Sequence, residues 1–325
     1  MRFIYMKRII FLFILLIAIP AFAQVDNSLS MYWAVPTQFN PAVAGSDSLM
    51  RIIAYDRMQW VGLKDKNAAE VDEIKAVGTK KGNKSPQTFY ISADMPLQIA
   101  GTKQGVGVSA LKETIDSLTT TRLGAQYAYN IKLPRKSSLS IGAQFGMVNS
   151  KFDTSAMRGN SNTTTPEGSK GDLTLEPEST DIDFALGAFY QKRVVRNELY
   201  LGLSAQKSNT YYFLAGGNIP VSRTLYIVQP SLLVRAAKGH TQVEATLRAT
   251  YNQRFWGGAS YRYDDAVVLM AGVDIQHFRL GYAYDIGISG LAKESHGSHE
   301  ILASYFLKLD LGKRKPHPMK SIRIL

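Results

Sequence analysis

The feature that most constrains this chain is an alternation of apolar and polar residues with a period of two, repeated between Thr241 and Asp310 with few residues between the repeats. In the stretch Thr241–Thr250, every second residue from Val243 to Ala249 is apolar and the residues between them are polar or charged. Such a stretch predicts a strand with one apolar face. Strands joined by so few residues are antiparallel neighbours. The resulting sheet is either half covered in water or closed around a polar lumen in an outer membrane, and the alternation by itself leaves both open.

The N-terminus has the order of residues that is typical of a secretory signal peptide. Lys7 and Arg8 precede an apolar run, Ile9–Ile19, and Ala21-Phe22-Ala23 then provides small residues for cleavage. We expect cleavage after Ala23, so that residues 1–23 are a signal peptide. A membrane anchor helix is the alternative, but the run is shorter than the about 20 apolar residues that cross a bilayer.

The composition of the mature chain excludes several kinds of site and of membrane attachment. The sequence has no cysteine, which excludes disulfides, a thiolate metal site and a lipoprotein anchor. No apolar run after the signal approaches about 18 residues, so any membrane span has to be a strand. The formal charge of +12 becomes +9 when Arg2, Lys7 and Arg8 leave with the signal. On an exported chain this basic balance does not indicate nucleic-acid binding.

The same alternation predicts about 14 strands between residues 49 and 310. With an even number of strands, both ends of the sheet lie on one side and the long connections Val61–Gln87, Ser150–Asp181 and Gly287–Ser298 lie on the other, as in outer-membrane barrels. The count is even only if Thr210–Ile219 is a strand of its own. We therefore predict an all-β fold, a transmembrane antiparallel β-barrel of about 14 strands preceded by a cleaved signal peptide. A soluble all-β protein remains the alternative, as does an interdomain linker for the longest loop.

Two residue types support the barrel. Tyrosines gather near strand ends, which suits the aromatic girdles at membrane interfaces, and Tyr127, Tyr211 and Tyr212 are examples. Glycines such as Gly142 and Gly202 lie on the polar face, where we expect them to relieve crowding in a curved wall.

No stretch carries a convincing active site. The densest candidate is His296-Gly297-Ser298-His299-Glu300, but two histidines three residues apart lack the further ligands of a zinc site. A hydrolase with His299 as base and Glu300 as orienting group stays open, although no Gly-x-Ser-x-Gly elbow is present. We predict no catalytic, cofactor-binding or metal-binding residues and a protein that is not an enzyme. Arg57-x-Gln59-Trp60 fits a buried lumen network, an anchor for a partner or an interfacial tryptophan, and the sequence leaves these three interpretations open.

Short motifs spread in order over nearly the whole mature chain resemble those of the PorP/SprF family of Bacteroidetes outer-membrane proteins. They are Phe39-Asn40-Pro41-Ala42-x-Ala44-Gly45, Arg57-x-Gln59-Trp60, Ser92-Ala93-Asp94-Met95-Pro96-Leu97, Gly105-x-Gly107-Val108, Pro230-Ser231-Leu232-Leu233-Val234-Arg235, Phe255-Trp256-x-Gly258-x-Ser260-Tyr261-Arg262, Gly281-Tyr282-x-Tyr284-Asp285, Ser298-His299-Glu300-Ile301 and Ser321-Ile322-Arg323-Ile324-Leu325. Each motif alone is weak, whereas the series is fairly specific. The chain departs from the family pattern at Ser30-Met31-Tyr32-Trp33 and at Asp56.

The resemblance implies a non-enzymatic barrel that works in type IX secretion. It implies a role in the export or surface attachment of substrate proteins such as adhesins, in gliding motility or virulence. The implied partners are periplasmic ring and motor lipoproteins, a secreted substrate protein and outer-membrane lipid, with no nucleic acid and no cofactor. An outer-membrane channel or transporter for a small solute is the alternative.

This interpretation divides the chain as follows. Residues 24–48 form a periplasmic segment leading into the barrel, residues 49–310 form the outer-membrane barrel, and residues 311–325 form a basic periplasmic tail, so that both termini lie in the periplasm. The candidate partner or lumen contacts are Asn40, Pro41, Arg57, Gln59, Trp60, His299, Glu300 and Arg323.

Overall fold

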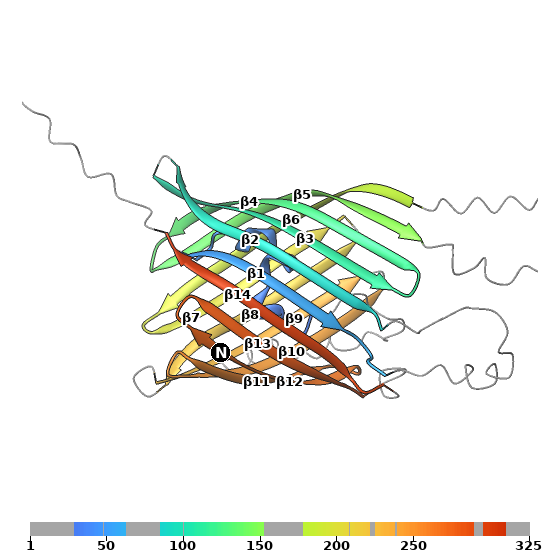
Figure 1. Ribbon diagram of the computed structural model, residues 1–325. Helices are drawn as coiled ribbons and strands as arrows, with labels where there is room; N and C mark the ends of the chain where they lie inside the picture. The colour runs from blue at the N-terminus through green and yellow to red at the C-terminus, as the bar shows by residue number, and fades with distance from the viewer. Residues whose placement is uncertain are drawn as a thin grey trace, which may run out of the picture.

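A computed structural model shows a closed barrel of 14 antiparallel strands that run obliquely around the lumen (Figure 1). The structure describes residues 29–47, 49–62, 85–99, 101–152, 178–207, 209–221, 225–237, 239–288 and 295–309. Each strand pairs with its neighbours in sequence, and the first strand closes the barrel against the last, from Leu49 opposite Lys308 to Met58 opposite His299. The predicted antiparallel barrel is confirmed, and so is the strand at Thr210–Ile219 on which the even count depends.

The strands have the following bounds: β1 Leu49–Met58, β2 Gln87–Ile99, β3 Thr102–Ile115, β4 Leu118–Leu133, β5 Ser137–Phe152, β6 Glu178–Val194, β7 Asn197–Gln206, β8 Thr210–Val221, β9 Tyr226–Ala237, β10 His240–Tyr251, β11 Phe255–Arg262, β12 Ala266–Ile275, β13 Phe278–Gly287 and β14 Ser298–Lys308.

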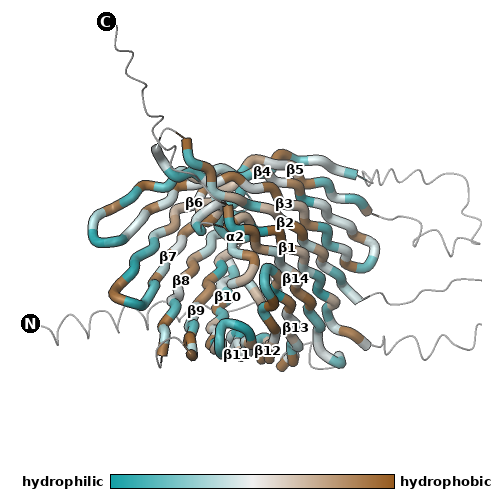
Figure 2. Tube along the Cα trace, turned by 60° about the vertical axis from the view of Figure 1, so that its left-hand side comes forward, coloured by the Kyte–Doolittle hydropathy of each residue, from teal (hydrophilic) through white to brown (hydrophobic). Residues whose placement is uncertain are grey.

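Strand β10 shows how the alternation produces the wall of the barrel. Thr246 and Arg248 are buried, whereas Leu247 between them is 59% exposed on the outer surface. The pairing with β9 and β11 places Pro230 and Ala259 beside Leu247. Figure 2 shows polar and apolar residues following one another along many of the strands. The predicted apolar face is therefore the outer surface of the barrel.

The two ends of the barrel differ in their connections. At the end where β1 begins and β14 finishes, six links of two to four residues join the strands, and we call this the short-turn end. The longest connections, residues 59–86, 153–177 and 288–297, lie at the other end, which we call the long-loop end. Asp264, in the hairpin between β11 and β12, has a φ of 55°, a conformation that aspartate tolerates in turns.

Residues Leu29–Ser46 lie inside the barrel, and we call them the plug segment. They form three short helical turns, η1 (Tyr32–Ala34), α2 (Pro36–Phe39) and η2 (Pro41–Val43), and Figure 2 places α2 within the ring of strands. Most of the segment is buried against the inner wall. For residues 29–46 this corrects the prediction of a periplasmic segment at residues 24–48, because a lumen of 14 strands is wider than wall side chains fill by themselves. Residues 24–28 lie outside the described part of the chain.

Glycines on the inner wall make room for the plug segment. A side chain at Gly142 would come within 2.5 Å of the backbone N and Cα of Ala42, and one at Gly105 would come within 1.9 Å of the Ala44 carbonyl oxygen. The curvature of the wall is therefore not the reason for glycine at these two positions. The plug backbone lies where a side chain would otherwise be.

The tyrosines divide between the two faces of the wall. Tyr211 is 57% exposed on the outer surface, whereas the ring of Tyr212 packs edge-on against Phe39 of the plug segment, with 5.4 Å between the ring centroids. The prediction that both belong to an interfacial girdle is wrong for Tyr212. Successive residues of a strand point to opposite faces, so two adjacent tyrosines cannot share one.

Three predicted regions lie outside the described residues: the signal peptide at residues 1–23, most of the long loop, at residues 153–177, and the basic tail at residues 311–325. None of the helices in the described part of the chain has the length and hydrophobicity to cross a bilayer.

Candidate functional site

Five charged side chains from five strands meet inside the barrel near its long-loop end. They are Arg57 of β1, Glu244 of β10, Arg262 of β11, Asp285 of β13 and Glu300 of β14, and we call them the ion cluster. None of them is more than 3% exposed. Arg57 pairs with Glu300 and lies 3.1 Å from Asp285, while Arg262 lies 3.0 Å from both Glu244 and Asp285. Their strands bring them together because each occupies an inward position at the same end of the barrel.

The ion cluster binds the start of the plug segment through Ser30. The Ser30 backbone N–H donates to the two carboxylate oxygens of Glu300 at 3.2 and 3.0 Å, and the Ser30 hydroxyl donates to the same carboxylate at 2.8 Å. Arg262 Nη2 donates to the Ser30 hydroxyl oxygen at 2.9 Å. Hydrogen bonds to ionised groups are roughly twice as strong as those between neutral groups. The plug segment is thus held to the wall by charge-assisted bonds.

The plug segment also completes the electrostatics of the ion cluster. Two arginines face three carboxylates there, and a buried charge without compensation is costly. Glu300 accepts the donors of Ser30 and also a hydrogen bond from the Tyr55 hydroxyl. Polar groups of the plug segment therefore stabilise a carboxylate that the two arginines do not neutralise alone.

The middle of the plug segment is fixed by the side chain of Asn40. Its Nδ2 donates to the carbonyl oxygens of Ala188 in β6 and Leu203 in β7, at 3.0 and 3.2 Å. Its Oδ1 accepts from the backbone N–H of Ala42 at 2.9 Å, which caps η2, and the buried Pro41 begins that turn. Both of these sequence-predicted residues thus lie in the lumen.

A second ionic contact marks the point where the plug segment turns into β1. Arg51 donates to both carboxylate oxygens of Asp94 in β2 at 2.9 Å, and Asp94 also accepts from the backbone N–H of Gly45 at 2.9 Å. Gly45 has a φ of 59°, a conformation that glycine adopts without steric cost. The plug segment is therefore held at its start, middle and end.

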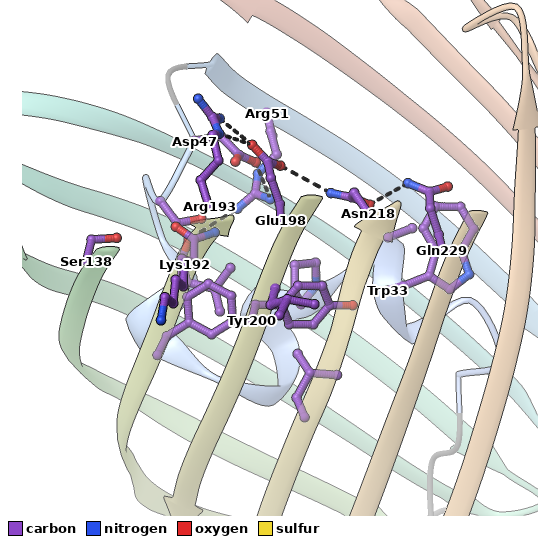
Figure 3. A pocket seen from close by; sticks show the side chains of 18 of the residues that line it. Trp33, Asp47, Arg51, Ser138, Lys192, Arg193, Glu198, Tyr200, Asn218 and Gln229 are labelled. Atoms are coloured by element: carbon purple, nitrogen blue, oxygen red, sulfur yellow. Dashed lines mark hydrogen bonds and ion pairs between the residues drawn. The ribbon is translucent and has the colours of Figure 1, made fainter. Parts of the chain in front are cut away.

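A cavity of about 610 Å³ lies between the plug segment and the short-turn end (Figure 3). Its lining includes Trp33 and Pro36 of the plug segment and Tyr200 and Arg248 of the wall. The guanidinium carbon of Arg248 lies 3.3 Å from the centre of the Trp33 ring, which is cation–π geometry. The plug segment thus forms one wall of the cavity.

His299 and Glu300 point to opposite sides of the barrel wall. Glu300 is fully buried in the ion cluster, whereas His299 Nδ1 lies 2.6 Å from the Tyr282 hydroxyl on the outer surface. They cannot act together as base and orienting group, so the hypothesis of a hydrolase built on this pair is wrong. Among the described residues, no group of three or more His, Cys, Asp or Glu side chains is placed to hold a metal ion.

Gln59 and Trp60 belong to the connection after β1 and not to the ion cluster that contains Arg57. The Gln59 N–H donates to the Pro86 carbonyl at 2.8 Å, and the Trp60 N–H donates to the Ser298 hydroxyl at 3.2 Å. These bonds order the start of the connection at the long-loop end. Arg323 lies outside the described residues.

Sequence reasoning missed most of the residues that hold the plug segment. They are Ser30, Tyr55, Glu244, Arg262 and Asp285. The sequence gives one indication of these residues: all of them except Ser30 are polar residues at inward-facing positions of strands in which apolar and polar residues alternate. Which inward charges meet depends on the register around the whole barrel, and that information is not local to any strand.

Comparison with known families identifies the chain. A family model described as "Type IX secretion system membrane protein PorP/SprF" matches residues 21–305. The chain belongs to this family. The resemblance in short motifs is thereby confirmed, and the protein is an outer-membrane β-barrel of type IX secretion. Membership of the PorP/SprF family implies interaction with other components of that secretion system.

Solved structures share the barrel architecture at very low identity. The Acinetobacter baumannii outer membrane protein Omp33 is 8% identical with a TM-score of 0.46, and the match covers 80% of this chain and 99% of that chain. A Pseudomonas aeruginosa FadL homologue is 9% identical with a TM-score of 0.47, and the match covers 80% of this chain and 90% of that chain. No curated protein sequence matches the chain.

Proposed function

We propose that this PorP/SprF protein is a non-catalytic component that helps to export substrate proteins or attach them to the cell surface. The substrates are adhesins or similar proteins that serve gliding motility or virulence. The observation that supports this proposal is the plug segment, which occupies the lumen and is bonded to the wall through Ser30, Asn40 and Gly45. A barrel filled in this way is suited to binding partners at its two ends.

The sidedness follows the usual arrangement of outer-membrane barrels, with short turns in the periplasm and long loops outside. On this arrangement the short-turn end, where β1 begins and β14 finishes, faces the periplasm, where the ring and motor lipoproteins of the secretion system are the partners. The long connections at residues 59–86 and 153–177 face outwards, where they meet the exported substrate. Outer-membrane lipid covers the apolar outer surface of the wall.

The test is mild detergent extraction of a tagged copy from its own outer membrane, followed by mass spectrometry of the proteins that come with it. We expect periplasmic ring lipoproteins or one large surface adhesin, and loss of surface display of that adhesin when the gene is deleted. Normal surface display of every type IX substrate in the deletion strain would refute the proposal.

A channel for a small solute is the second candidate, and the polar cavity near the short-turn end favours it. Planar bilayer recordings separate the two candidates. The plug segment predicts that the purified barrel conducts no more current than a bilayer without protein. Steady single-channel currents from the unchanged protein would favour the channel.

A further inference from the structure

The cavity between the plug segment and the short-turn end is strongly basic. Seven of its lining residues are cationic and two, Asp47 and Glu198, are acidic. Arg51, Arg193 and Arg279 form ion pairs with Asp94, Glu198 and Asp274. The cations of the lining without an ion pair among the described residues are Lys103, Lys136, Lys192 and Arg248. A concave site lined mainly by one sign of charge attracts ligands of the opposite sign. We propose that this cavity binds a short acidic peptide segment of a partner protein.

Arg248 is the residue that points most directly to an anionic ligand. It is 9% exposed, it lines the cavity, and its Nε has no hydrogen-bond partner. No carboxylate in the described part of the chain lies within ion-pair distance of it, and its guanidinium carbon lies 3.3 Å and 5.9 Å from the ring centres of Trp33 and Trp256. A buried cation without a counterion is unfavourable, so an incoming carboxylate gains the full interaction with it.

The positive charge extends from the mouth of the cavity to its depth. Lys136 lies in the exposed turn between β4 and β5, and it too has no carboxylate partner among the residues described. Arg248 lies three residues inside the end of β10, which corresponds to about 10 Å of strand. An extended acidic segment of about three residues spans this depth, whereas one small anion reaches only part of it.

The walls of the cavity favour a peptide for a second reason. The aromatic rings of Trp33, Phe189 and Tyr200 lie beside the charged groups, and Figure 3 shows Trp33 and Tyr200 on neighbouring parts of the lining. Such a mixed surface accepts the apolar part of a peptide as well as its carboxylates. A lipid headgroup does not fit this site, because the lining faces the lumen and not the bilayer. The C-terminal stretch Lys313-Arg314-Lys315 of this chain is itself basic, so it does not complement the cavity.

The inference rests on the proposed function only for the idea that the ligand belongs to a partner protein. Binding is tested on the purified full-length protein in detergent, with fluorescence anisotropy of a labelled hexaglutamate peptide. Hexalysine carrying the same label is the control probe, and unlabelled glutamate and inorganic phosphate are added as competitors.

Lys136→Glu and Arg248→Gln are compared with Lys207→Glu, which reverses one exposed charge at the long-loop end. We expect Lys136→Glu and Arg248→Gln each to raise the Kd for hexaglutamate about tenfold and Lys207→Glu to leave it unchanged. Retained heat-dependent mobility in gels shows that a variant still forms the barrel. The side chain of Lys136 is exposed, so the Lys136→Glu variant tests the proposal even if Arg248→Gln fails to fold.

The proposal is overturned if hexaglutamate does not bind, if Lys207→Glu weakens binding as much as Lys136→Glu, or if free glutamate or phosphate displaces the peptide at equal concentration. The last result would assign the cavity to a small anion. If the peptide does not bind but the deletion strain loses secretion, only the cavity proposal is refuted. If the peptide binds but secretion in the deletion strain is normal, only the proposed function is refuted.

Discussion

The bond between Ser30 and Glu300 can be tested by Glu300→Gln, which keeps the shape of the side chain and removes its charge. Ser30 offers two donors to this carboxylate, its backbone N–H and its hydroxyl. Hydrogen bonds to charged groups contribute about 1.5–3 kcal/mol, and neutral ones about 0.5–1.5 kcal/mol. The substitution therefore weakens the attachment of the plug segment by about 2 kcal/mol in total.

The wall should tolerate this change. Without the charge of Glu300, Arg57 and Arg262 face Glu244 and Asp285, so the remaining buried charges balance. A loss of about 2 kcal/mol multiplies the population of chains with a released plug segment by roughly thirtyfold.

Cysteine labelling measures that population directly, because the chain contains no cysteine of its own. Val35 of the plug segment is fully buried, so a Val35→Cys thiol reacts with a maleimide only when the segment leaves the lumen. We expect Glu300→Gln to raise the labelling rate roughly thirtyfold. Glu178→Gln, at an exposed glutamate near the long-loop end, should leave the rate unchanged. Equal rates with and without Glu300→Gln would refute the attachment of the plug segment through Ser30.

Three further predictions concern the wall and the plug segment. Leu247→Arg should reduce the free energy of unfolding in lipid by about 2–4 kcal/mol, measured by denaturant titration, and a negligible loss would place Leu247 inside the barrel. Gly142→Ala should speed the labelling of Val35→Cys, because the new Cβ meets backbone atoms of the plug segment at 2.5 Å, whereas Gly257→Ala, with its nearest atom at 3.5 Å, should not. Asn40→Ala should destabilise the folded protein by about 1–3 kcal/mol, because two partly buried carbonyl oxygens lose their Nδ2 donor, and an unchanged melting temperature would contradict that account.

The candidate site could be predicted only in part, and particular residues show why. The motif around Asn40 and Pro41 marked that stretch as important, yet nothing near it in sequence indicates that Asn40 reaches β6 and β7. Glu300 was a candidate together with His299, and only the strand alternation, applied residue by residue, separates the two onto opposite faces. The partners of Glu300 come from residues some 240 to 270 positions away in the chain.

The wall of the barrel follows from local patterns in the sequence. Its period of two, its short turns and its lack of long apolar runs predict an antiparallel barrel with an apolar outside, and residues such as Leu247 lie where that pattern puts them. These signals are local, because strand formation and facing depend on neighbours one or two positions apart.

What fills the lumen depends on how the whole barrel closes. An inward residue meets a neighbour, water or another segment according to the register and width of the closed barrel, and these are properties of all 14 strands together. The plug segment, the ion cluster and the basic cavity therefore cannot be predicted from any one stretch of the chain. They arise because closing the sheet brings polar residues from distant strands into a confined space, where buried charge must find a partner.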